Sequence, residues 1–236
     1  MHDQWELLRG AGLGRGFTGT WVESGDADGV AALLGADLTS RQDCDLSTAM
    51  AHYRPMAFTE RIWTGAHSDG WTFALTISGP PPVTTGLEEA GLRFLQIRTV
   101  DSHVHDLLHS DGVTTGWATQ RWYGEVVVDP GSMLEPCLQE VGRPEMPAAV
   151  HSGSWATEPE HHGRVCLEIH LFLAGRMSGR FIDHEWPDEK RALYTVPLPG
   201  GPGQSLIPAT IPLRSGTSGS EAITVTATPS RSTQPT

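Results

Sequence analysis

Basic residues are scarce in this chain of 236 residues, which has one lysine, Lys190, and no asparagine. Lysine and arginine together number 16 against 28 aspartates and glutamates, so the formal net charge is −12. Nucleic-acid binders need lysine and arginine to neutralise phosphates, and this charge excludes that class of partner. Lysine and asparagine both use A-rich codons, so their scarcity is also typical of a GC-rich coding sequence.

Long apolar runs and paired cysteines are missing as well. No apolar segment approaches the length of a membrane span, and Met1–Gly16 lacks the basic-then-apolar layout of a secretory signal. The three cysteines, Cys44, Cys137 and Cys166, are far apart and form no Cys-x-x-Cys pair. Secreted domains more often carry even numbers of closely spaced cysteines. We therefore expect a cytoplasmic protein with free thiols and no membrane partner.

Recognisable catalytic motifs are also absent. The sequence contains no Gly-x-Ser-x-Gly elbow, and Lys190 follows Glu189 rather than the glycine of a phosphate loop. Neither Gly10 nor Gly12 begins a dinucleotide fingerprint, because Arg15 and Phe17 stand where the third glycine would be required. In His184–Asp188 an aspartate replaces the second histidine of the helical metalloprotease motif, and Pro187 interrupts a helix. No residue is assigned a catalytic role.

Alternation of apolar and polar residues predicts an antiparallel sheet built from hairpins. Ser68-Asp69-Gly70 turns a hairpin over 57–78, and Ser110-Asp111-Gly112 turns another over 102–122. The clearest alternation is in Trp71–Ile77. Further strands are expected at Phe17–Val22, Leu92–Val100, Glu125–Asp129, Val165–Leu173, Arg180–Ile182 and Leu193–Val196.

Short helices are expected between these strands. They are predicted in Met1–Arg9, Asp26–Gly35, Leu46–Tyr53, Leu87–Ala90 and Gly131–Gly142. The fold class is therefore α+β, with one domain over 1–196 and a sub-boundary near 144–153. Residues 197–236 are rich in Gly, Pro, Ser and Thr, a composition that predicts a disordered C-terminal tail.

Three segments in order resemble an uncharacterised domain family found mainly in actinobacteria. They are Phe17–Gly35 with its final Leu-Leu-Gly, the hairpin return Asp69–Leu75, and Val128–Gly142. The resemblance covers about residues 15–143 and consists of apolar and turn positions rather than a polar motif. It implies an α+β domain with an antiparallel sheet, and it brings no activity, cofactor or catalytic residue.

Histidine is the one chemically suggestive excess, with 11 residues in the chain. His103 and His105 are two apart on a predicted strand, and so are Glu168 and His170, so each pair would share one strand face. If the two strands were neighbours, the four side chains could hold Zn²⁺ or another divalent metal. That arrangement would indicate a metal-dependent hydrolase. The alternative is that these histidines are solvent-facing and that the protein has no cofactor.

Tryptophan is the second excess, with eight residues. Several lie in predicted loops or flank a cation, as aromatic anchors of protein interfaces do. The partner-binding candidates are Trp117, Arg121, Trp122, Trp155 and Trp186. With the acidic charge, they favour a protein-binding or accessory module without catalytic activity, which neutralises or docks a basic partner. The metal-dependent hydrolase is the alternative.

Overall fold

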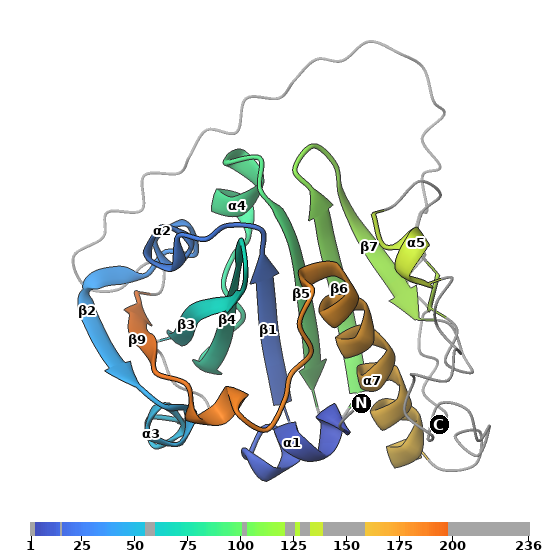
Figure 1. Ribbon diagram of the computed structural model, residues 1–236, viewed down its shortest axis with the longest axis horizontal. Helices are drawn as coiled ribbons and strands as arrows, with labels where there is room; N and C mark the ends of the chain where they lie inside the picture. Colours follow the sequence, from blue (N-terminus) through green and yellow to red (C-terminus); the bar gives the residue numbers. More distant parts are fainter. Residues whose placement is uncertain are drawn as a thin grey trace, which may run out of the picture.

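The computed structural model describes residues 3–14, 16–54, 60–100, 103–120, 126–127, 133–138 and 159–197. These residues form an α+β fold around one antiparallel sheet, in which nine described strands follow the order β2-β9-β3-β4-β1-β5-β6-β7-β8 (Figure 1). The strands are β1 Gly16–Val22, β2 Asp37–Cys44, β3 Glu60–Ser68, β4 Trp71–Ser78, β5 Arg93–Val100, β6 His103–Asp111, β7 Thr115–Gln120, β8 Val126–Val127 and β9 Arg191–Val196. The predicted fold class is confirmed.

Six α-helices and one 3₁₀ helix are described. They are α1 Gln4–Gly10, α2 Ala27–Leu33, α3 Leu46–Met50, α4 Thr85–Glu89, α5 Glu135–Leu138, α7 Pro159–Ser178 and the 3₁₀ helix η2 Trp186–Asp188. The start of α2 follows the sequence prediction, because the Asp26 side chain accepts a hydrogen bond from the Gly29 N–H. Its end does too, since Gly35 adopts a positive φ of 84° just after the helix.

Both predicted hairpins are present, β3 with β4 and β6 with β7. Gly70 and Gly112 have φ of 72° and 91° in their turns, a backbone region that residues with a Cβ rarely adopt. The edge strand β2 was not predicted. Most of its side chains are exposed, so it lacks the apolar alternation that marks a half-buried strand.

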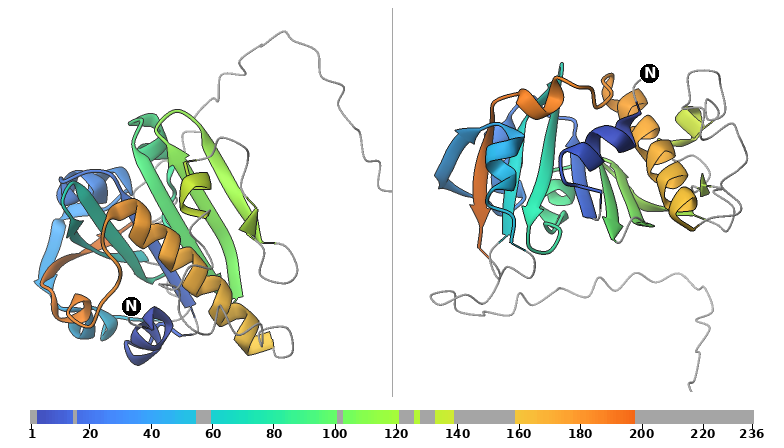
Figure 2. Two further views of the ribbon diagram at one scale, coloured as in Figure 1. Left: turned by 45° about the vertical axis from the view of Figure 1, so that its right-hand side comes forward. Right: turned by 90° about the horizontal axis from the view of Figure 1, so that it is seen from below.

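Helices cover both faces of the sheet (Figures 1 and 2). On one face, α1, α3, α7 and η2 pack against the inward side chains of the central strands, including Trp21, Trp63 and Phe73. On the other face, Val30 of α2, Leu34 just after that helix and Leu87 of α4 form a second apolar cluster with residues of the same strands. Both faces of the central strands are therefore buried.

The predicted strand Val165–Leu173 is wrong, because these residues belong to helix α7. Every residue from Leu167 to Gly175 except the polar Glu168 and His170 is apolar or glycine, and Leu167–Ala174 are all buried. Periodicity alone cannot assign such a short buried run to strand or helix. The predicted strand Arg180–Ile182 is also wrong, since these residues form the loop between α7 and η2.

Two organisational predictions fall outside the described residues: the sub-boundary near 144–153 and the tail from residue 198 onward. Within the described part of the chain, no helix has the length and apolarity needed to cross a membrane.

Candidate docking groove between α1, α3 and η2

Two of the four predicted metal ligands, Glu168 and His170, lie on a helix rather than on a strand. Glu168 and His170 are 0% and 1% exposed in the middle of α7, where residues two apart point to different sides of the helix. The strand placement predicted for Glu168 and His170 is therefore wrong. His103 and His105 lie on β6, but their side chains are outside the description. Among the side chains that are described, no group of three or more potential ligands could hold a metal ion.

Of the five predicted partner-binding residues, the structure describes two, Trp117 and Trp186. Trp117 on β7 is 54% exposed, as an interface anchor should be, and it lies opposite Leu108 of β6. Trp186 is 1% exposed and packs edge-on against Trp63 at 5.4 Å between ring centroids, so it belongs to the core and offers no surface to a partner. Arg121, Trp122 and Trp155 lie outside the described residues.

A buried cation that the sequence analysis missed lies beneath η2. The guanidinium of Arg191 lies 4.9 Å from the ring centroid of Trp63 and 5.7 Å from those of Phe73 and Trp186. Its aliphatic stem crosses Gly65 on β3, where an added Cβ would lie 2.8 Å from the Arg191 Cγ. A glycine inside a strong strand pattern was the available sequence signal for this close approach.

Arg191 also belongs to an ion-pair network that orders the loop carrying η2. Its Nη2 donates to Glu189 at 2.6 Å, and Glu189 accepts from Arg180 Nη2 at 2.5 Å. Arg180 in turn pairs with Asp183 at 3.2 Å. Burial works to raise the pKa values of Asp183 and Glu189, but the arginines outweigh it and lower both. Both carboxylates are therefore charged and held in place at neutral pH.

Helix α1 is fixed by acidic groups at its first turn. The Asp3 side chain accepts from the Glu6 N–H at 3.1 Å and pairs with Arg164 of α7. Glu168 of α7 accepts from the Trp5 N–H at 2.6 Å. Burial raises the pKa of Glu168 to about 8, although the hydrogen bond from Trp5 opposes that shift.

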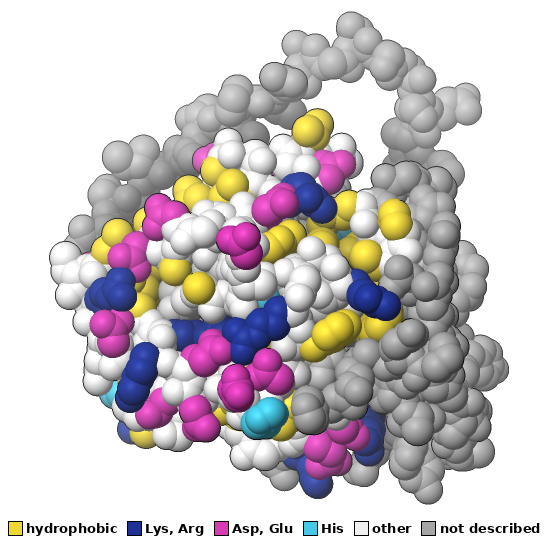
Figure 3. All heavy atoms as spheres, viewed as in Figure 1, with side chains coloured by type: hydrophobic (Ala, Val, Ile, Leu, Met, Phe, Trp, Pro, Cys, Tyr) yellow, Lys and Arg dark blue, Asp and Glu magenta, His cyan; other side chains and the backbone are white. Residues whose placement is uncertain are grey.

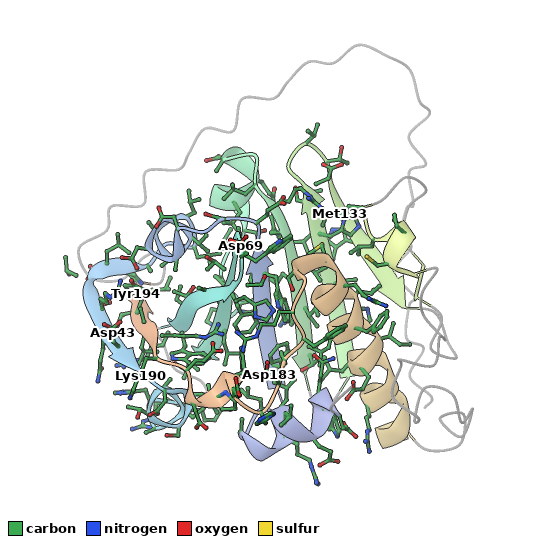
Figure 4. All side chains as sticks on the ribbon, viewed as in Figure 1. Asp43, Asp69, Met133, Asp183, Lys190 and Tyr194 are labelled. Carbon is green, nitrogen blue, oxygen red and sulfur yellow. The ribbon has the colours of Figure 1, made fainter. Side chains whose placement is uncertain are left out.

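Helix α3 begins in the same way, with Asp45 accepting from the Thr48 N–H at 2.9 Å. That hydrogen bond is the main reason why the pKa of Asp45 is lowered. Lys190, just before β9, lies 3.3 Å from Asp45, just before α3, and so links the starts of the two elements (Figure 4, where Lys190 and Asp183 are labelled).

Helices α1, α3 and η2 enclose a groove of about 420 Å³, which we call the docking groove. It is lined by Glu6, Leu7, Gly10, Ala11, Leu46, Ser47, Pro187 and Asp188. Its walls are mainly apolar, while its charged groups are the two carboxylates of Glu6 and Asp188, and none of these lining residues is basic. Figure 3 shows acidic side chains gathered over the lower part of this face.

The two carboxylates of the docking groove differ in how far they are already neutralised. Glu6 forms an ion pair with Arg9 at 2.6 Å. Asp188 is exposed, and no basic side chain in the described part of the chain forms an ion pair with it. A cationic group entering the groove would therefore meet an unneutralised carboxylate at Asp188.

Comparison with known proteins adds no function to this geometry. No family model, no curated protein sequence and no solved structure matches the chain.

Proposed function

We propose that this protein is a binding module that docks a basic segment of a partner protein in the docking groove. The observation that carries the proposal is the pairing of apolar walls with the carboxylates of Glu6 and Asp188 and no basic lining residue. An arginine or lysine side chain has the matching form, because its aliphatic stem can lie on Leu7, Leu46 and Pro187 while its charged end meets a carboxylate.

The charge of the whole chain supports the same partner. A net charge of −12 attracts basic proteins over a distance and accelerates their encounter, and it repels nucleic acid. Trp117, exposed on β7, is a further apolar contact available to a large partner. The strand-borne metal centre is not proposed as an alternative, since Glu168 and His170 are buried in α7.

The test is the binding of a fluorescent peptide of alternating arginine and leucine to the full chain, measured by anisotropy. We expect Asp188→Lys to weaken binding at least tenfold, or about 1.4 kcal/mol, because it replaces an attractive charge by a repulsive one. The side chain of Asp188 is exposed and makes no hydrogen bond within the described residues, so the fold should be unaffected.

Glu89→Lys is the matched control. Glu89 is exposed on α4, away from the groove, and its substitution changes the net charge by the same amount. Affinity should weaken only slightly in this variant, through the loss of long-range attraction, which salt screens. Equal losses in the two variants would show that the peptide responds to net charge alone and would refute the groove. The groove would also be refuted if the peptide bound equally well with glutamate in place of arginine.

A further inference from the structure

A second cavity lies on the other face of the sheet, where the ends of α2 and β9 approach α4. Its volume is about 350 Å³, within the range of about 300–1,000 Å³ typical of small-molecule sites. The lining residues are Leu33, Leu34, Gly35, Glu60, Pro80, Pro81, Val83, Gly86, Val196 and Pro197. Apart from Glu60, every one of these side chains is apolar or absent.

Glu60 is a buried carboxyl in this apolar cavity. The residue is 3% exposed, and its Oε1 atom has no hydrogen-bond partner within the described structure. A buried polar atom without a partner is costly, and native proteins usually satisfy such groups. An unsatisfied oxygen that lines a cavity therefore points to a hydrogen-bond donor that the described residues do not supply.

The backbone holds Glu60 firmly at this position. Glu60 is the first residue of β3 and is paired with Val196 of β9, which lines the same cavity. Gly79, just after β4, packs against the backbone of Glu60, and an added Cβ there would lie 2.8 Å from the Glu60 Cα. Its φ is 90°. The backbone of Glu60 is thus positioned by the sheet rather than by a loop, as precise binding sites require.

We propose that this cavity binds a small organic amine, with its ammonium group against the Glu60 carboxylate and its hydrocarbon part against Leu33, Leu34 and Val196. An ammonium group supplies both the missing hydrogen-bond donor and the opposite charge. The apolar walls favour an alkyl or aryl amine over a polyamine, whose second charge would be buried without a partner. This site shares no residue with the docking groove and is independent of the function proposed there.

The other charged groups on the surrounding elements do not compete for Glu60. Arg61, next on β3, lies 3.0 Å from His52, and Glu88 of α4 accepts from Thr84 at 2.8 Å. Asp28 of α2 accepts hydrogen bonds from Arg41 and from the hydroxyl of Tyr194. Tyr194 lies on β9 and is labelled in Figure 4. Arg191 of β9 pairs with Glu189, and Glu89 of α4 is exposed.

Binding should be coupled to the release of a proton. Burial raises the pKa of Glu60 to about 8, so the empty site is mostly protonated at neutral pH. An ammonium ion favours the ionised carboxylate and displaces that proton. Below pH 8, affinity should therefore rise about tenfold per pH unit, because each unit raises the ionised fraction tenfold.

Calorimetry with phenethylamine on the full chain tests the proposal, with 2-phenylethanol and 3-phenylpropionate as neutral and anionic analogues. Titrations in two buffers of different ionisation enthalpy count the protons released. We expect close to one proton per amine bound near neutral pH, and binding of the two analogues at least tenfold weaker. Absence of amine binding, binding without proton release, or equal affinity for the alcohol would overturn the proposal.

Substitution identifies the carboxyl responsible. Glu60→Gln preserves the shape of the side chain, and we expect it to abolish proton release and to weaken amine binding at least tenfold. Glu89→Gln makes the same change of side chain at an exposed position on α4 and should leave both quantities unchanged. An unchanged titration of Glu60→Gln would overturn the site, and if this variant does not fold, the proton count of the natural chain decides.

Discussion

The free energy of unfolding is expected to fall as the pH rises from about 5 to 8, because two buried carboxyls resist ionisation. Burial raises the pKa values of both Glu60 and Glu168 from 4.5 to about 8. Between these values the folded state binds more protons than the unfolded state, so stability decreases with pH. Each carboxyl contributes a slope of about 1.4 kcal/mol per pH unit, and both together about 2.7 kcal/mol.

A buried histidine acts in the opposite direction over part of this range. Burial lowers the pKa of His67 from 6.5 to about 4, so its contribution to stability is complete above pH 6.5 and is lost as the pH falls toward 4. Between pH 4.5 and 6.5, His67 therefore offsets about half of the slope due to the carboxyls. Stability should fall most steeply between pH 6.5 and 8.

Urea unfolding at several pH values across this range measures the slope. We expect Glu60→Gln and Glu168→Gln each to remove about half of the slope above pH 6.5, about 1.4 kcal/mol per pH unit. Near pH 5 both carboxyls are protonated in the folded state, so the variants should differ least from the natural chain there. Glu89→Gln, at an exposed position, should leave the slope unchanged. Parallel stability profiles for the natural chain and Glu60→Gln would contradict the prediction.

Local sequence signals were sufficient for the hairpins and the early helices. A glycine in each turn and alternating side chains on both sides determine β3–β4 and β6–β7 without reference to the rest of the fold. They were not sufficient for α7. Its apolar residues satisfy a strand pattern, and only the packing of α7 on β5 and β6 makes the helix the stable alternative.

The docking groove could not be predicted because its residues are far apart in the chain. Glu6, Leu46 and Asp188 come together only when α1, α3 and η2 pack on the same face of the sheet. The aromatic surroundings of Arg191 likewise depend on strand register, which places Gly65 beside Arg191 across β3 and β9. Trp186 illustrates the same limit, since an aromatic residue in a loop can anchor a partner or fill the core, and only the fold decides.

Arg191→Ala should lower the free energy of unfolding by about 3–5 kcal/mol. The substitution removes a cation that contacts three aromatic rings and leaves a hole over Gly65. It also deprives the partly buried Glu189 of one of its two arginine partners. Arg93→Ala is the control, because Arg93 and Glu23 form an exposed pair at 3.0 Å, which contributes about 0–1 kcal/mol.

Arg191→Met separates the contribution of the packed stem of Arg191 from that of its charge. Methionine keeps an apolar stem over Trp63 and Phe73, while Glu189 retains its bond to Arg180. We therefore expect a smaller loss of stability than for alanine. Both variants should also weaken binding of the arginine–leucine peptide, since Arg191 and Glu189 hold the loop that carries Asp188 into the docking groove. If Arg191→Ala lowers the free energy of unfolding no more than Arg93→Ala does, Arg191 does not order the loop that carries Asp188. The docking groove must then be held by its apolar contacts alone.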